Sequence, residues 1–198
     1  MSCRSYFLKG KNMSYEKKIV AIGDSITYGF PYLPCLSWVH LAGKELGLSI
    51  INKGVNGNTS SQMVERFDFD VISQLPSHVI IMGGTNDACV KVEAEEVANN
   101  IRYMVETALQ YGITPLIGLP IPCSCPQDEY ILALYREDMR EYVLTNKLAV
   151  IDFYTAFLKG KRRQVEFYAD GLHPNERGYK VMAKIAVKAL QTQMSRNP

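Results

Sequence analysis

The chain has 198 residues, of which 47% are hydrophobic and 21% are charged. This length and composition are typical of a soluble single-domain globular protein, and they exclude a disordered chain, a collagen and a multispan membrane protein. The 22 Lys and Arg residues exceed the 20 Asp and Glu residues by only two, which gives no reason to expect nucleic-acid binding.

Residues 1–16 precede the first predicted strand, and we expect them to form an N-terminal extension that is a candidate for disorder. Its longest apolar stretch, Tyr6–Leu8, is too short for the hydrophobic region of a secretory signal peptide. No other apolar run is long enough to span a bilayer, so we expect a cytoplasmic protein without stable membrane insertion. Met1 and Met13 remain alternative start residues.

Short apolar runs alternate with longer segments of helical periodicity along the rest of the chain, residues 17–198. The runs are continuous rather than alternating in polarity, which is typical of strands covered on both faces in a parallel sheet. The five predicted strands are Lys18–Ile22, Leu48–Asn52, His78–Met82, Thr114–Leu119 and Leu148–Phe153.

The predicted helices lie between these strands and after the last one. Val97, Ile101, Met104, Val105 and Leu109 recur at helical spacing in one of them, and Tyr130, Leu134 and Met139 do so in another. Strands that alternate with helices predict a three-layer α/β/α domain over residues 17–198, in which ligands bind beyond the carboxyl ends of the strands. The five predicted helices are Ser37–Leu46, Ser60–Leu75, Glu93–Tyr111, Gln127–Asn146 and Asn175–Met194.

Four polar segments that contain glycine stand where such a sheet keeps its binding site. Three of them directly follow predicted strands, and the fourth precedes the last predicted helix. Each alone is compatible with ordinary turn chemistry, because Gly, Asn, Asp and Ser are common in loops. The four segments are Gly23–Gly29, Lys53–Ser60, Gly83–Asp87 and Tyr168–Pro174.

Ser25, Asp170 and His173 carry the residue types of nucleophilic catalysis. Ser25 follows a buried strand, where it is either the N-cap of a helix or a nucleophile activated by a histidine base. Asp170 and His173 are separated by two residues, one of them glycine. The carboxylate could therefore orient the imidazole, or the segment could simply cap the last helix ahead of Pro174.

Gly54 and Asn86 are candidate donors to a developing oxyanion. The backbone N–H of Gly54 can approach a substrate without a Cβ in the way, and Asn86 offers a side-chain amide. Turn chemistry is again the alternative explanation of both residues.

These segments, in this order, resemble the motifs of the SGNH (GDSL-type) hydrolase family. The first motif is Gly23-Asp-Ser-Ile-Thr27, and the second contains Gly54 within Asn52–Ser60. The third is Gly84-Thr-Asn-Asp87, and the fourth is Asp170-Gly-Leu-His-Pro174. The resemblance extends over nearly the whole chain, from about residue 17 to about residue 190.

The resemblance implies a flavodoxin-like five-stranded parallel sheet and a serine hydrolase that cleaves carboxylic esters or thioesters. Ser25 would be the nucleophile that forms an acyl-enzyme, His173 the general base and Asp170 its orienting carboxylate. The backbone N–H groups of Ser25 and Gly54 and the side chain of Asn86 would form the oxyanion hole. No metal and no organic cofactor are implied.

Several further residues and segments are interpreted from their position in the chain. We interpret Asp24 and Asp87 as residues that structure their loops. The segment Pro120–Pro126 is expected to form one wall of the acyl pocket, and Phe30, Tyr32 and Leu172 are expected near its entrance. The basic cluster Lys159–Arg163 is either a solvated loop or a site for an anionic group. The five cysteines have irregular spacing, so a structural or incidental role is expected rather than a metal or redox role, and a reducing cytosol would keep the thiols free. They are Cys3, Cys35, Cys89, Cys123 and Cys125.

Two other classes of function stay open at this point. A flavodoxin-like module that binds a small ligand such as a phosphate or a flavin would explain the loop glycines, but not the pairing of Asp170 with His173. A catalytically inactive relative of the hydrolase family is the second alternative. The sequence does not decide the acyl-chain length or the oligomeric state.

Overall fold

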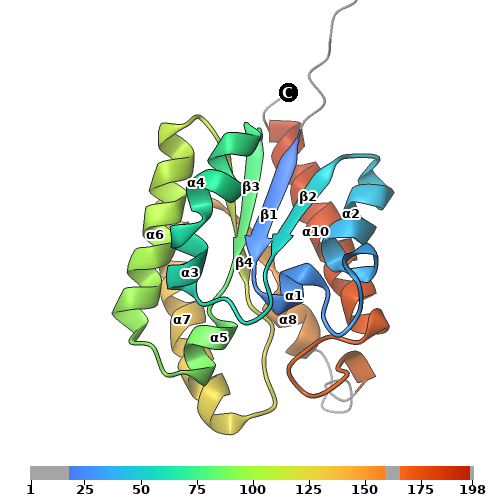
Figure 1. Cartoon of the computed structure of the whole chain (residues 1–198), viewed down its shortest axis with the longest axis vertical. Helices are drawn as coiled ribbons and strands as arrows, with labels where there is room; N and C mark the ends of the chain where they lie inside the picture. Colours follow the sequence, from blue (N-terminus) through green and yellow to red (C-terminus); the bar gives the residue numbers. More distant parts are fainter. Residues whose placement is uncertain (1–17, 159–165, 197–198) are drawn as a thin grey trace, which may run out of the picture.

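The computed structural model describes residues 18–158 and 166–196, whose strands form one five-stranded parallel sheet (Figure 1). The strand order is β2-β1-β3-β4-β5, the flavodoxin-like order. The predicted fold class is therefore confirmed, and each predicted strand overlaps an observed one. The strands are β1 (Ile19–Gly23), β2 (Ile50–Gly54), β3 (His78–Met82), β4 (Thr114–Leu119) and β5 (Ala149–Asp152).

Helices cover both faces of this sheet, with α2 and α10 against one face and α3, α6 and α7 against the other (Figure 1). Short helices also begin directly after β1, β3 and β5. The α-helices are α1 (Ser25–Tyr28), α2 (Trp38–Leu46), α3 (Ser60–Glu65), α4 (Phe67–Asp70), α5 (Thr85–Cys89), α6 (Ala94–Gln110), α7 (Pro126–Thr145), α8 (Phe153–Leu158) and α10 (Glu176–Arg196). The 3₁₀ turns are η1 (Pro34–Leu36) and η2 (Ile72–Gln74).

The continuous apolar run of β1 is explained by burial on both sides of the sheet. Ile19 and Ala21 belong to the cluster that contains Trp38 and the buried face of α10. Val20 and Ile22 belong to the cluster that contains the buried faces of α6 and α7. All four side chains have no exposed surface, and full burial of an Ile or Val side chain contributes about 1.5–3 kcal/mol.

The apolar residues that recur at helical spacing in α7 do not all face the sheet. Tyr130 and Leu134 are 70% and 46% exposed, whereas Met139 is buried. The buried face is instead formed by Leu132, Tyr135, Arg136, Met139 and Val143. Two sets of apolar residues share helical spacing in this segment, and only contact with the sheet distinguishes them. Leu109 of α6 is likewise exposed rather than buried.

The single helix predicted over Ser60–Leu75 is divided into α3, α4 and η2. The break lies at Arg66, whose backbone (φ −107°, ψ 5°) is not helical. The last residue, Leu75, adopts a left-handed conformation (φ 50°). It precedes Pro76, and a residue before proline is disfavoured in a right-handed helix.

The order of the strands determines where the site is formed. The chain leaves β1 toward β2 at one edge and then returns to β3 on the other side of β1. Loops that follow β1 and β3 therefore diverge, which is where ligands bind in sheets of this order. None of the helices in residues 18–158 and 166–196 has the length and apolarity that a membrane crossing requires. The predicted extension and the basic cluster Lys159–Arg163 lie outside the described residues.

Candidate active site

Ser25 lies at the carboxyl edge of the sheet, as the first residue of α1 directly after β1. Asp24 caps this helix: its Oδ1 accepts a hydrogen bond from Ile26 N–H at 2.8 Å. The N-cap interpretation of Ser25 is therefore wrong, because the neighbouring aspartate has that role. Ser25 is 7% exposed, and its backbone N–H has no hydrogen-bond partner within the described parts of the chain.

Asp170 and His173 form a local carboxylate–imidazole pair in the loop before α10. Asp170 Oδ2 lies 2.7 Å from His173 Nδ1, and Oδ1 accepts the backbone N–H groups of His173 (2.7 Å) and Leu172 (3.0 Å). Gly171 adopts φ 83° between them, a conformation that favours glycine. Asn175 caps α10 through its Oδ1, so the alternative that Asp170 and His173 cap the helix is wrong.

His173 joins this pair to Ser25, 148 residues earlier in the chain. Its Nε2 lies 3.0 Å from Ser25 Oγ. When Nδ1 carries the ring proton and donates a hydrogen bond to Asp170, Nε2 is free to accept the serine proton. The Phe30 ring contacts the imidazole edge-on, with a centroid separation of 4.6 Å. The carbonyl oxygen of Phe30 is in turn held by Tyr179 Oη at 2.6 Å.

The pKa values of the two aspartates beside this array are shifted in opposite directions. Burial raises the pKa of Asp170, but the hydrogen bonds from His173 and Leu172 outweigh it and hold the pKa below its ordinary value. For Asp24, burial dominates and raises the pKa to about 6, against the hydrogen bond from Ile26 and the charge of His173. Asp24 Oδ2 is buried and has no hydrogen-bond partner within residues 18–158 and 166–196.

Gly54 does not have the predicted arrangement of an oxyanion donor. Its N–H already donates to Asn52 Oδ1 at 2.9 Å, so this part of the prediction is corrected. Glycine is needed here for another reason: a Cβ would overlap the backbone nitrogen of Tyr28, where the end of β2 approaches α1. The position therefore serves packing between β2 and α1.

The loop of residues 55–59 brings a different N–H group to this edge. A turn is closed by Asn58 N–H to the carbonyl oxygen of Val55 at 3.2 Å, with Gly57 at φ 79°. The Gly57 N–H has no hydrogen-bond partner in the described part of the chain. Sequence reasoning missed Gly57, although Asn56-Gly57 is a typical turn signal.

Asn86 and Asp87 fasten this loop to the segment after β3. One amide hydrogen of Asn86 Nδ2 is donated to the carbonyl oxygen of Asn58 at 2.9 Å, which leaves the other for a ligand. Asp87 accepts Ser60 Oγ–H at 2.6 Å and the Ser60 N–H at 3.0 Å. The predicted loop-structuring role of Asp87 agrees with these contacts.

The segment Pro120–Pro126 lies beside the loop that carries Asp170. Ser124 N–H donates to the carbonyl oxygen of Gly171 at 2.9 Å, and Tyr168 Oη donates to that of Pro122. Together the two segments line a cavity of about 240 Å³ that also borders Asp170. A cavity of about 430 Å³ between α6 and α7 borders none of the candidate site residues.

The β4–α7 loop is anchored by a buried arginine. Glu129 accepts the N–H of Cys123 at 3.0 Å and forms an ion pair with Arg136. Arg136 is 1% exposed, and its guanidinium also stacks on the Tyr154 ring, 4.1 Å from the centroid. Burial and the charge of Glu129 raise the pKa of the Cys123 thiol to about 11, which disfavours the thiolate. The cysteines in residues 18–158 and 166–196 are free, and these residues contain no cluster of His, Cys, Asp or Glu that could hold a metal ion.

Comparison with known proteins points to one family. The sequence model of the GDSL-like lipase/acylhydrolase family matches residues 21–181. A protein of Desulfitobacterium hafniense DCB-2, described as lipolytic and of the G-D-S-L family, superposes with a TM-score of 0.82 at 31% identity. The match covers 87% of this chain and 99% of that protein.

Three curated relatives match at different lengths. The uncharacterized lipoprotein YqeF of Bacillus subtilis is 32% identical over 117 residues, which is 52% of this chain and 48% of that protein. The acetylxylan esterase of Geobacillus stearothermophilus is 49% identical over 87 residues, which is 36% of this chain and 40% of the esterase. The chain thus matches less than half the length of these two relatives. Thioesterase 1/protease 1/lysophospholipase L1 of Escherichia coli K12 is 23% identical over 180 residues, 87% of this chain and 83% of that enzyme.

Proposed function

Because the chain belongs to the GDSL-like lipase/acylhydrolase family, a family of carboxylic ester hydrolases, we propose that it hydrolyses esters or thioesters through an acyl-enzyme on Ser25. The observation that carries this proposal is the continuous array from Ser25 Oγ to His173 Nε2 (3.0 Å) and from His173 Nδ1 to Asp170 (2.7 Å). A nucleophile, a base and an orienting carboxylate in this geometry are the requirement for acyl transfer.

Acylation begins at the serine hydroxyl. Ser25 Oγ attacks the carbonyl carbon, and its proton passes to His173 Nε2 as the new C–O bond forms. Asp170 stays ionised, since its pKa is lowered, and stabilises the imidazolium that results. The contact with Phe30 shields one edge of the ring and limits its rotation.

The negative charge that develops on the carbonyl oxygen needs preorganised donors. We assign this role to the Ser25 N–H, to the second amide hydrogen of Asn86 and to the Gly57 N–H, in place of Gly54. The two backbone groups have no hydrogen-bond partner within the described residues, and the Asn86 amide has one hydrogen to spare. Substitution Asn86→Ala should lower kcat by about 10²–10³-fold.

Acylation is completed when the imidazolium of His173 protonates the leaving alcohol or thiol, as the tetrahedral intermediate collapses to the acyl-enzyme. Deacylation then uses the same groups. Water then attacks the acyl carbon while Nε2 accepts its proton. Collapse of the second tetrahedral intermediate returns a proton to Ser25 Oγ and releases the carboxylic acid.

Short acyl groups are the substrates that we propose. The resemblance to an acetylxylan esterase over 87 residues supports this proposal. Because another relative is a thioesterase and lysophospholipase, the panel to be tested also includes thioesters and longer acyl chains.

The other two classes of function account for less of the site. A phosphate- or flavin-binding module requires no contact between Ser25 and His173, and an inactive relative requires no intact array. We propose that residues 17–198 act as one hydrolase domain. The cytoplasmic location stays a prediction, and one relative is a lipoprotein.

Hydrolysis of a matched panel tests the proposal. Aryl esters and acyl thioesters from two to twelve carbons would be assayed with the wild type, Ser25→Ala and His173→Ala. We expect turnover to be highest for the shortest chains and to fall at least about 10³-fold in both variants, with unchanged thermal unfolding. Ser73→Ala, which alters an exposed serine of η2, should keep wild-type turnover. Wild-type rates in Ser25→Ala would refute the proposal.

A further inference from the structure

The side chain of Arg66 joins the segments that carry the proposed site. Its Nε donates to Asn58 Oδ1 at 2.7 Å, and its Nη2 donates to the carbonyl oxygen of Gly23 at 2.8 Å. Its Nη1 donates both to the carbonyl oxygen of Lys53 at 2.9 Å and to Asp70 Oδ2 at 2.7 Å. Four of the five donors of the planar guanidinium are therefore used. The side chain is 17% exposed, so these bonds are partly protected from water.

Two of these acceptors, Gly23 and Asn58, are close in the chain to groups with a proposed role. Gly23 is the last residue of β1, two positions before Ser25. The carbonyl oxygen of Asn58 accepts the amide of Asn86 at 2.9 Å, while the Asn58 side chain accepts Arg66. Asn58 therefore connects the guanidinium to the Asn86 amide, and Gly23 connects it to the nucleophile.

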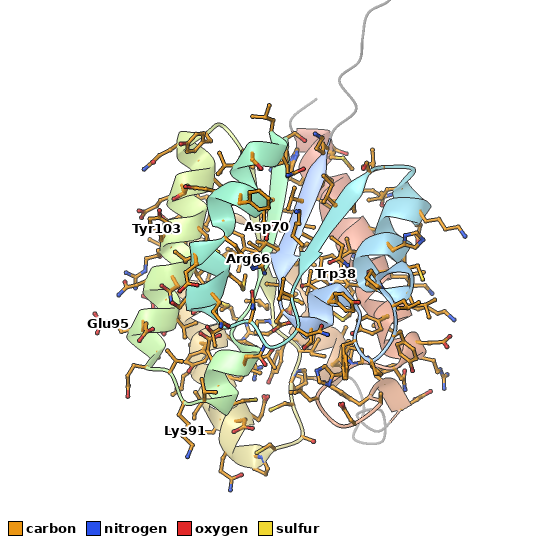
Figure 2. The ribbon with its side chains drawn as sticks, in the orientation of Figure 1. Trp38, Arg66, Asp70, Lys91, Glu95 and Tyr103 are labelled. Atoms are coloured by element: carbon orange, nitrogen blue, oxygen red, sulfur yellow. The ribbon has the colours of Figure 1, made fainter. Side chains whose placement is uncertain are left out.

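Asp70 orients the guanidinium from one helical turn further along the chain. It accepts Arg66 through Oδ2 and Lys53 Nζ through Oδ1 at 2.8 Å. Burial raises the pKa of Asp70, but the hydrogen bonds from Lys53 and Arg66 outweigh it and lower the pKa. The carboxylate thus stays ionised at neutral pH. Arg66 and Asp70 lie beside each other on the side of the sheet that α3 and α4 cover (Figure 2).

We propose that Arg66 is a positioning residue for ester hydrolysis: it fixes the loop of residues 55–59, and through Asn58 the amide of Asn86, in the orientation that stabilises the oxyanion. This inference rests on the proposed function. Arg66 touches neither substrate nor the reacting atoms, and it acts through Asn58 and Gly23. Its effect is therefore on kcat rather than on substrate binding.

The substitution Arg66→Lys tests whether the geometry of the guanidinium or only its positive charge is needed. Lysine keeps the positive charge but has no planar fork, so it cannot satisfy Asn58, Gly23 and Asp70 together. We expect kcat for a short aryl ester to fall about 10²-fold with KM changed by less than about threefold. Arg102→Lys is the matched control, because Arg102 on α6 also donates to an asparagine, Asn99 (2.9 Å), and lines the cavity between α6 and α7 that borders none of the candidate site residues. It should leave both constants unchanged.

A double-mutant cycle distinguishes positioning from a general loss of stability. Because Arg66 also holds the loop that carries the Gly57 N–H, part of the loss should remain when Asn86 is already alanine. In that background Arg66→Lys should lower kcat by a factor at least about threefold smaller than in the wild-type background. A purely structural role would give the same loss in both backgrounds. Equal losses in the two backgrounds, or wild-type kcat in Arg66→Lys, would overturn the inference.

Asn58→Ala serves if Arg66→Lys does not fold. It removes one acceptor of Arg66 but keeps the carbonyl oxygen that holds Asn86, and we expect the same loss of kcat and the same dependence on Asn86. An unchanged kcat in Asn58→Ala would overturn the inference. A different result would refute the proposed function: wild-type enzyme that hydrolyses no ester or thioester of the panel.

Discussion

Ser25 Oγ and His173 Nε2 lie 3.0 Å apart although 148 residues separate them in the chain. Ser25 is fixed by the junction of β1 and α1, and His173 by a loop that Asp170 holds through three hydrogen bonds. The contact therefore depends on the packing of α10 against the sheet face that α2 shares with it. Variants that shift either segment should impair activity before they unfold the protein.

Replacement of Asp170 by asparagine tests the orientation of the imidazole. The carboxylate accepts Nδ1–H, which selects the tautomer whose Nε2 can take the Ser25 proton. A neutral amide no longer imposes this tautomer and no longer stabilises the imidazolium, so we expect kcat to fall by about 10²–10⁴-fold. Steady-state kinetics with a short aryl ester measure this loss. Wild-type kcat in a folded Asp170→Asn protein would show that the carboxylate is not needed.

Gly171→Ala should displace the same pair without unfolding the domain. Gly171 has φ 83°, and a Cβ there would overlap Ser124 Oγ in the neighbouring loop. We expect a decrease in stability of about 1–2 kcal/mol and a loss of about 10²-fold in kcat. Gly112→Ala is the control, because Gly112 also has a positive φ (71°) but has open space around it. The control should lose similar stability and no activity; equal kcat values in the two variants would contradict this explanation.

Asp24→Asn should change how stability depends on pH. Because the pKa of Asp24 rises from 3.8 to about 6 in the fold, the native state holds a proton that the unfolded chain releases at lower pH. Wild-type stability therefore falls as the pH rises from about 4 to about 6, by up to about 3 kcal/mol from this group. Asparagine does not titrate, so the free energy of unfolding of the variant should increase relative to that of the wild type as the pH rises over that interval. Denaturant unfolding at pH 4 and pH 7 measures the difference, and parallel pH profiles for the two proteins would contradict it.

Glu129→Gln should destabilise the protein, because the buried Arg136 loses its ion pair with the Glu129 carboxylate. Arg136 is 1% exposed, and the partly exposed Glu129 is its ion-pair partner. We expect the free energy of unfolding to fall by about 2–3 kcal/mol, because the remaining charge stays buried. Glu137→Gln, which removes the exposed pair with Arg140 at 3.9 Å, should cost about 0.5 kcal/mol or less. Similar values for the two variants would show that burial of Arg136 has no energetic consequence.

The strands could be predicted from the sequence, and the segments that carry Ser25, Asp170 and His173 could be singled out, because their signals are local. β1 is a continuous apolar run directly followed by Asp24 and Ser25, and Asp170 and His173 are three positions apart. The pairing of Ser25 with His173 depends on tertiary structure, and it was available at the sequence level only through resemblance to a family.

The proposed oxyanion donor in the loop of residues 55–59 and the buried face of α7 were not predictable in the same way. Gly54 and Gly57 are both glycines in one polar segment, and only the turn and the hydrogen bond from Gly54 to Asn52 show which N–H is unused. Tyr130 and Leu132 each belong to a set of α7 residues with helical spacing. Only contact with the sheet decides that Leu132 is buried and Tyr130 is exposed. The position of Arg66 depends on acceptors from four segments, which no local pattern encodes.

Labelling with a fluorophosphonate, followed by mass spectrometry of the intact chain and of its peptides, tests the central claim most directly. The account predicts one adduct per chain, located on Ser25, with labelling that slows strongly in His173→Ala and is absent in Ser25→Ala. Ester hydrolysis without an adduct, or an adduct on another residue that abolishes the activity, would contradict it.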